Sequence, residues 1–153
     1  MTTKLVTIIS VFLLFLMGYS AQAFEVKGIA GTTTFCQRGK CVTTIDNSEV
    51  IYEVNLDVQK VTRKAVLNKS IPNNTIGGLQ SDNTEYAVFY DNKDLETRKL
   101  FNEQRIIKAI GKTALLDGFE TIVIGDDFIH TSRSSSDYFV IYYYKRVGTI
   151  PIR

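Results

Sequence analysis

The chain has 153 residues, of which 44% are apolar and 22% charged, with 18 basic and 16 acidic side chains. This composition fits one globular domain and excludes a disordered, collagen-like or coiled-coil chain. A formal net charge of only +2 gives no support for nucleic-acid binding.

The first 23 residues have the three parts of a secretory signal. Lys4 is followed by an apolar run over residues 5–17, which is shorter than the about 20 residues that a membrane-spanning helix needs. Ser20-Ala21-Gln22-Ala23 then matches the small-x-small pattern of signal peptidase sites, with no cysteine at the cut to be acylated. We expect a cleaved signal peptide (1–23), no membrane span after cleavage, and one domain (24–153) in the periplasm or outside the cell.

Two cysteines follow the first predicted strand, residues 24–34. If Arg38-Gly39 forms a two-residue turn, Cys36 and Cys41 become a non-hydrogen-bonded pair, whose Cα atoms are about 4.5 Å apart. A disulfide accepts that spacing, and an exported protein meets an oxidising compartment. A C-x4-C metal pair is the alternative, but it lacks two further ligands because His130 is the single histidine. The sequence therefore predicts a structural Cys36–Cys41 disulfide.

The middle of the chain alternates between strand and loop signals. A turn is expected at 46–48, and strict alternation of apolar and polar residues over 50–58 predicts a strand with one buried face. The change of phase near Gln59-Lys60 indicates either a bulge or the start of a second strand. Residues 70–84 are polar, contain Pro72, Gly77 and Gly78, and predict a surface loop before a strand at 85–90.

A long amphipathic helix is expected at about 94–117, closed by Gly118. Its apolar side would carry residues such as Leu100, Ile107 and Leu115, opposite a charged side that includes Arg105. Further strands are predicted at 119–124, at 128–131 after a possible bulge at 125–127, and at 138–147. The predicted fold class is thus α+β, a twisted and mainly antiparallel sheet of about six strands with this helix on one face.

No constellation of residues predicts catalysis. Asp126 lies about 13 Å from His130 along an extended strand, so an Asp–His–Ser relay cannot form there. The same loop offers too few ligands for a metal site, and no phosphate-binding or hydrolase motif is present. We expect a non-enzymatic protein without a cofactor or a metal.

The segment 138–147 is rich in aromatic and basic residues. Such side chains are common in binding surfaces and also in ordinary strands. If one face is exposed, it predicts contacts with a partner, and the candidate residues are Tyr142, Tyr143, Tyr144, Lys145 and Arg146.

Residues 85–124 resemble a pattern found in small Gram-negative envelope proteins, many of them lipoproteins of uncharacterised function. The similar segments are Tyr86-Ala-Val-Phe-Tyr90, Ala114-Leu-Leu-Asp-Gly118 and Phe119-Glu-Thr-Ile-Val-Ile124, which together span about 40 residues. The chain departs from that pattern because it lacks the acylated cysteine. The resemblance implies a location in the bacterial envelope and an α+β fold, and it transfers no functional residues.

Export, small size and the aromatic strand together favour a protein that binds another macromolecule, such as an envelope component or an enzyme that it inhibits. A periplasmic carrier of a small molecule is the alternative, and a small hydrolase using His130 is a third. No nucleic-acid partner is expected.

Overall fold

The computed structural model describes residues 23–67, 80–112 and 118–148. These residues form strands and one short helix, α2 (Leu95–Phe101), which lies between the fourth and fifth strands. In chain order the strands are β1 (Phe24–Gln37), β2 (Lys40–Asn55), β3 (Lys60–Leu67), β4 (Gln80–Asp91), β5 (Ile107–Lys112), β6 (Phe119–Ile124), β7 (Phe128–Ser134) and β8 (Tyr138–Val147).

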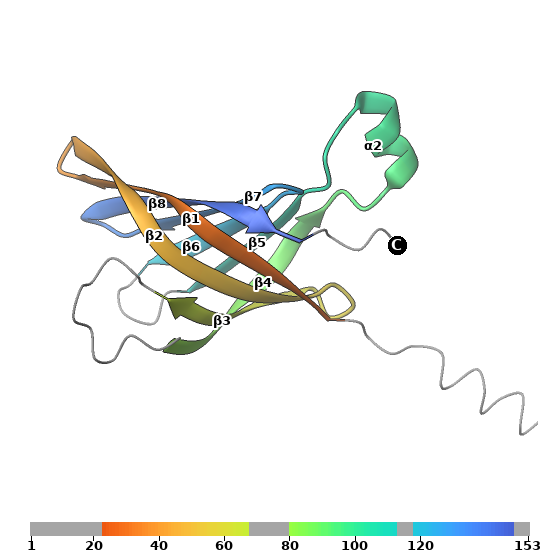
Figure 1. Ribbon diagram of the computed structural model, residues 1–153, viewed down its shortest axis with the longest axis horizontal. Helices are drawn as coiled ribbons and strands as arrows, with labels where there is room; N and C mark the ends of the chain where they lie inside the picture. Colours follow the sequence, from red (N-terminus) through yellow and green to blue (C-terminus); the bar gives the residue numbers. More distant parts are fainter. Residues whose placement is uncertain (1–22, 68–79, 113–117, 149–153) are drawn as a thin grey trace, which may run out of the picture.

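The eight strands close into one antiparallel barrel (Figure 1). Each strand pairs with the next in sequence, and β8 returns to pair with β1 from Lys27↔Val147 to Gln37↔Tyr138. We call the end with the β2–β3 turn, α2 and the β6–β7 turn the helix end. The opposite end, with the Arg38-Gly39 turn and the β7–β8 turn, is the hairpin end. Closure pairs every strand on both sides, so the barrel has no free edge.

The α+β prediction is wrong, because the helix expected at about 94–117 is confined to α2. Asn102 ends α2 in the left-handed conformation, and its backbone N–H bonds back to the last turn. From Ile107 the chain is a strand, with Ile107 and Ala109 buried between β4 and β6. The apolar residues here fit both periods, but β-branched isoleucines favour a strand once a neighbour on each side can pair with them. Residues 113–117 lie outside the described part.

The structure also bears on four predictions about turns, bulges and loops. The turn expected at 46–48 is wrong, since β2 runs through it and buries Ser48. The change of phase near Gln59 marks a second strand rather than a bulge, after a turn at 56–59 in which Gln59 has a φ of 51°. The bulge expected at 125–127 is a turn between antiparallel strands. Of the loop expected at 70–84, residues 80–84 belong to β4, and 68–79 lie outside the described part.

The predicted disulfide is confirmed. Arg38 and Gly39 both have positive φ values, 49° and 78°, as a two-residue hairpin turn requires. Cys36 pairs with Cys41 in the β1–β2 register, with their Cα atoms 4.1 Å apart.

Side chains fill the centre of the barrel, as expected for eight strands. Alternate residues of every strand point inward, and Tyr52 and Tyr86 meet edge to face with ring centroids 6.3 Å apart. Gly28 allows Tyr144 to pack against the inner face of β1, because a Cβ at position 28 would lie 2.8 Å from the Cβ of Tyr144. The buried core consists of Val26, Val50, Tyr52, Val54, Val61, Tyr86, Ile107, Ala109, Ile122, Ile124, Ile129 and Tyr144.

Candidate functional site

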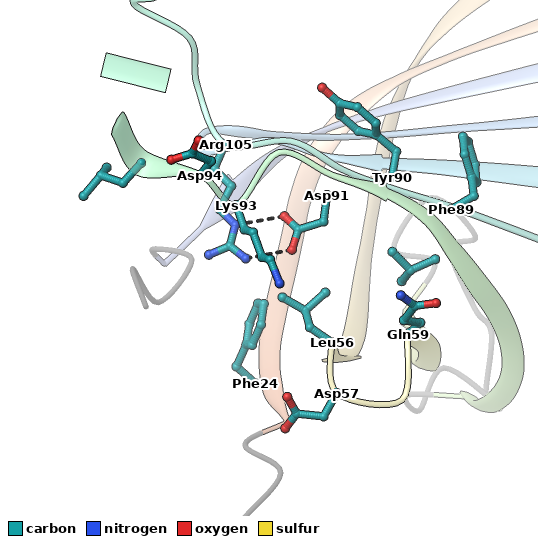
Figure 2. A pocket seen from close by; sticks show the side chains of 12 residues that line it. Phe24, Leu56, Asp57, Gln59, Phe89, Tyr90, Asp91, Lys93, Asp94 and Arg105 are labelled. Carbon is teal, nitrogen blue, oxygen red and sulfur yellow. Dashed lines mark hydrogen bonds and ion pairs between the residues drawn. The ribbon is translucent and has the colours of Figure 1, made fainter. Parts of the chain in front are cut away.

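A pocket of about 790 Å³ opens at the helix end of the barrel (Figure 2). It lies between the start of β1, the β2–β3 turn, the end of β4 and the segment that carries α2. Its lining residues are Phe24, Leu56, Asp57, Gln59, Val88, Phe89, Tyr90, Asp91, Lys93, Asp94, Leu95 and Arg105. A pocket of this size suits a small organic molecule.

The floor of the pocket is apolar. Phe24, Leu56 and Val88 are half-buried and pack on the barrel core. Phe24 begins β1, Leu56 lies in the β2–β3 turn, and Val88 lies in β4 near its end. Because all three pack on the core, the floor is a continuous part of the apolar interior of the barrel.

One wall of the pocket is a buried ion pair. Arg105 Nε donates to Asp91 Oδ1 at 3.2 Å, and its Nη2 donates to Oδ2 at 3.0 Å. The two side chains are 5% and 14% exposed, so water screens them little. The backbone N–H of Arg105 also donates to Asp126 Oδ2 at 3.2 Å, which ties this wall to the β6–β7 turn.

We call residues 92–106, which include α2, the α2 arm. Asn92 closes its base, because its Nδ2 donates to the Gln104 carbonyl at 2.9 Å and its Oδ1 accepts from the Ile106 N–H at 2.5 Å. Asp94 caps α2 by accepting from the Glu96 and Thr97 N–H groups. The hydroxyl and N–H of Thr97 donate to Asp94 and so lower the pKa of this exposed carboxyl.

A second arginine, Arg146, binds the β6–β7 turn at the same end of the barrel. Arg146 Nη1 donates to the carbonyls of Gly125 and Asp126 at 2.9 and 3.1 Å. Burial lowers the pKa of Arg146, and nearby Asp126 opposes this effect. Arg146 thus stabilises the β6–β7 turn from within.

The five residues predicted to bind a partner lie on both faces of β8. Tyr142, Tyr144 and Arg146 point into the barrel, whereas Tyr143 and Lys145 face outward. Tyr143 is half exposed and stacks on Phe128, with ring centroids 6.1 Å apart. The barrel therefore splits the predicted cluster, and only its outward pair is accessible to a macromolecule.

Nothing in the described part of the chain indicates an enzyme. His130 sits on the outer face of β7 between Val123 and Tyr143, and the Ser132 hydroxyl bonds to Thr121 rather than to this histidine. Within residues 23–67, 80–112 and 118–148, no three His, Cys, Asp or Glu side chains are placed to hold a metal ion. The described residues likewise include no helix long and apolar enough to cross a bilayer.

Sequence reasoning missed the pocket. Its residues come from segments far apart in the chain, and none of them belongs to a recognisable motif. Arg105 was expected on the exposed side of a helix. The one available signal is that Arg105, Ile107 and Ala109 alternate as inward residues of a strand do.

Comparisons with protein-family models, curated proteins and solved structures find no match to this chain. The resemblance of residues 85–124 to small envelope proteins therefore stays a prediction.

Proposed function

We propose that this protein is an exported carrier that binds a small amphipathic molecule in the helix-end pocket. The observation that supports this most directly is the pocket of about 790 Å³ at the mouth of a closed barrel whose centre is filled. Ligand sites commonly occupy the mouths of β-barrels, and they combine apolar walls with a few placed polar groups.

The lining indicates the chemistry of the ligand. Phe24, Leu56 and Val88 suit an apolar body, while Lys93 and the Arg105–Asp91 pair suit a polar group at its rim (Figure 2). Arg105 and Asp91 neutralise each other, so the wall carries hydrogen-bonding groups without a strong net charge. A neutral molecule with a polar end fits this arrangement better than a highly charged one.

The α2 arm forms one side of the proposed site. Figure 1 shows α2 standing off the barrel, connected through the ends of β4 and β5. Leu95 lines the pocket, whereas Leu100 and Phe101 are 78% and 65% exposed. Movement of this arm about its base at Asn92 would change the width of the pocket without disturbing the barrel.

The proposed location is the periplasm or the cell exterior. The Cys36–Cys41 disulfide is consistent with an oxidising compartment. The signal peptide expected at residues 1–23 lies, except for Ala23, outside the described residues and remains part of the proposal.

Binding of the neutral fluorescent probe N-phenyl-1-naphthylamine tests the pocket. Leu56→Arg places a charge on the apolar floor and should weaken probe binding at least tenfold. The matched control is Val58→Arg, in the same turn, because Val58 is 60% exposed and does not line the pocket. Its affinity for the probe should stay within twofold of the parent protein.

Equal affinities in the two variants, or no binding by the parent protein, would overturn the proposal. Native mass spectrometry of protein exported in its own host gives an independent readout. The parent should carry an added mass that Leu56→Arg loses and Val58→Arg retains.

A macromolecular partner is the second candidate function. The observation that favours it is the outward aromatic pair of Tyr143 and Phe128, with Lys145 paired beside Phe128 on the neighbouring strand. Cross-linking of the exported protein tests it: Tyr143→Ser should remove a dominant partner, and loss of no partner counts against this candidate.

A further inference from the structure

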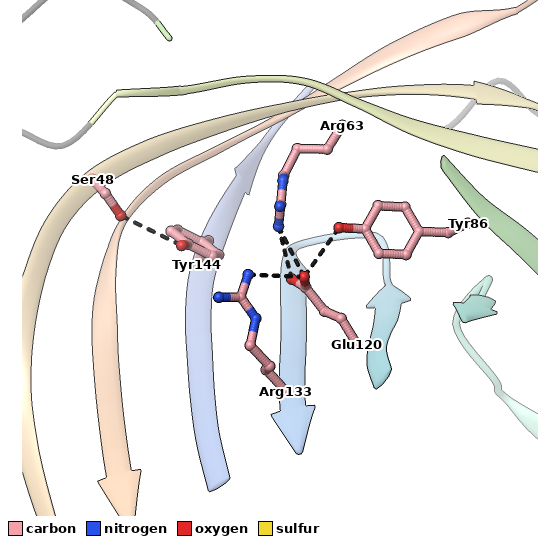
Figure 3. Close-up of polar contacts among 6 residues, drawn as sticks. All are labelled: Ser48, Arg63, Tyr86, Glu120, Arg133 and Tyr144. Atoms are coloured by element: carbon pink, nitrogen blue, oxygen red, sulfur yellow. Dashed lines mark hydrogen bonds and ion pairs between the residues drawn. The ribbon is translucent and has the colours of Figure 1, made fainter. Parts of the chain in front are cut away.

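Charged side chains that point into the barrel lie together in one cluster. Glu120 projects inward from β6, and its carboxylate accepts hydrogen bonds from Arg63 at 2.9 and 3.0 Å (Figure 3). Arg133 and the Tyr86 hydroxyl donate to the same carboxylate, each at 3.1 Å. These side chains point away from the outer surface, so a partner on that surface meets other residues.

On the outer surface of β1–β4, lysines are paired with glutamates. Three ion pairs of 2.6, 2.9 and 3.3 Å join neighbouring strands, and they are Lys27–Glu49, Lys60–Glu85 and Lys64–Glu53. The charge of each of these lysines is therefore already neutralised by a carboxylate beside it.

The outer surface of β5–β8, which we call the β5–β8 face, is largely apolar. Its outward positions alternate with inward ones along each strand and pair in rows across the four strands. Phe119 and Phe139 flank Ser134 in one row, and Val123 and Tyr143 flank His130 in another. The large apolar members are Ile110, Phe119, Val123, Phe139, Ile141 and Tyr143. An apolar surface that continues over several strands is typical of an interaction site.

The same face carries lysines without carboxylates. Its outward strand positions include Lys108, Lys112 and Lys145 but no aspartate or glutamate. Within the described part of the chain, none of these three lysines forms an ion pair, and Lys108 lies 5.0 Å from the centre of the Tyr90 ring. The aspartates of the β6–β7 and β7–β8 turns border the face rather than lie within it. The strand positions of the face thus carry three positive charges and no negative one.

This combination of side chains favours the surface of an anionic bilayer as the partner. Lysines attract negatively charged head groups, and their long side chains reach them while apolar neighbours approach the lipid. Tyrosine places its ring at the level of the head groups, and phenylalanine and isoleucine suit the boundary with the acyl chains. A second copy of the chain fits less well, because two such faces would bring lysines against lysines.

We propose that the β5–β8 face docks this protein on the surface of a bilayer that contains anionic phospholipids. The contact is peripheral: the outward side chains of four strands meet the head groups, and the ion-paired surface of β1–β4 faces water. The inference does not rest on the proposed ligand pocket, because none of the residues that line that pocket belongs to this face.

Co-sedimentation with vesicles tests the proposal. The exported protein is mixed with vesicles of phosphatidylcholine alone, or of phosphatidylcholine with about one-third phosphatidylglycerol. We expect the partition coefficient to be at least tenfold higher on the anionic vesicles and to fall as added potassium chloride screens the charges. Equal binding to both kinds of vesicle, or binding to neither, would overturn the proposal.

Two pairs of lysines give a comparison matched in charge. Lys112→Gln/Lys145→Gln removes two charges from the β5–β8 face and should lower the partition coefficient on anionic vesicles about tenfold. Lys60→Gln/Lys64→Gln removes the same charge from the other half of the barrel, and its partition coefficient should stay within about threefold of the parent. All four side chains lie on the outer surface, so both proteins should fold as the parent does. Equal losses would show that net charge rather than this face decides binding, and the proposal would fail.

Phe119→Ser tests the apolar part of the face. It should lower the partition coefficient on anionic vesicles severalfold, because Phe119 is 56% exposed and its ring would enter the head-group region. Val58→Ser is the control, since Val58 has similar exposure but lies in the β2–β3 turn, and it should bind as the parent does. Unchanged binding by Phe119→Ser would leave only charge attraction and would contradict docking by this face.

Cross-linking separates a bilayer from an acidic protein on the same face. A protein partner that Tyr143→Ser loses, together with no preference of the parent for anionic vesicles, would assign the face to a protein and overturn the bilayer. Probe binding in the helix-end pocket is a separate measurement, because Phe119, Lys112 and Lys145 lie outside that pocket.

Discussion

Asp91 and Arg105 are 14 residues apart and meet through two parallel contacts of 3.2 and 3.0 Å at the neck of the α2 arm. Asp91 is the last residue of β4, and Arg105 comes two residues before β5. The paired geometry fixes the planes of both groups, as a single contact would not. One ion pair therefore joins the arm to the barrel and forms a wall of the pocket.

Removing one charge of this pair should destabilise the protein. Asp91→Asn removes the carboxylate charge that faces the buried Arg105 guanidinium, and we expect the free energy of unfolding to fall by about 3 kcal/mol. Urea unfolding measures this change. Asp57→Asn is the matched control, since Asp57 lines the same pocket but is exposed, and its effect should be within about 0.5 kcal/mol. Equal losses would show that the pair does not hold the arm.

The seam between β1 and β8 depends on Gly31. A Cβ at this position would lie 1.5 Å from the Tyr143 carbonyl oxygen, at the bulge in the β1–β8 pairing. Gly31→Ala must displace backbone, and we expect a loss of about 3 kcal/mol in unfolding free energy.

Gly39→Asn is the control for the seam. Gly39 has open space around it, and asparagine tolerates its positive φ. It should unfold close to the parent in urea. A Gly31→Ala protein as stable as this control would contradict the close approach.

The disulfide should stabilise the hairpin without affecting the pocket. It closes a short loop, so the Cys36→Ser/Cys41→Ser double variant should lose about 2 kcal/mol of unfolding free energy. Affinity for N-phenyl-1-naphthylamine should stay within twofold, because the disulfide lies at the hairpin end. A large drop in probe affinity would mean that the two ends of the barrel are coupled.

His130 should make stability depend on pH. Burial lowers the pKa of this half-buried histidine below its ordinary value, so the folded state binds its proton less readily than the unfolded chain does. The stabilising effect is complete above the unfolded pKa of about 6.5 and is lost as pH falls through the lower folded pKa.

Unfolding in urea between pH 7.5 and 5 measures this dependence. In His130→Gln, the part of the pH dependence of the unfolding free energy that His130 contributes should disappear. Because the chain has one histidine, its NMR titration reports the folded pKa without ambiguity. A folded pKa at or above 6.5 would refute the prediction.

Much of the strand content was predictable from local patterns. The strands at 119–124 and 138–147 match β6 and β8 as the structure has them. The Cys36–Cys41 disulfide followed from the turn at Arg38-Gly39. These features depend on side-chain alternation and on hairpin geometry, which act over a few residues.

The sequence contains one indication of the inward cluster of Arg63, Glu120 and Arg133. Alternation places Glu120 on the same face as Ile122 and Ile124, and Phe119 on the other. The structure has Glu120 at 1% and Phe119 at 56% exposure, the reverse of what hydrophobicity alone would favour. A charged residue on an apolar face indicates a buried partner of opposite charge, but the sequence does not identify which residue that partner is.

The sequence by itself determined short-range features of this protein, such as the strands β6 and β8 and the hairpin with its disulfide, whereas export stays a prediction. Only the tertiary structure decided that residues 107–112 form a strand, because pairing with β4 and β6 outweighs local helix periodicity. It also decided that β8 closes on β1, a pairing between the two ends of the described chain. It also brought Phe24, Leu56 and Arg105 to one pocket and Arg63, Glu120 and Arg133 to one cluster. Those groups meet only when the barrel closes, since their members come from different strands and strand connections.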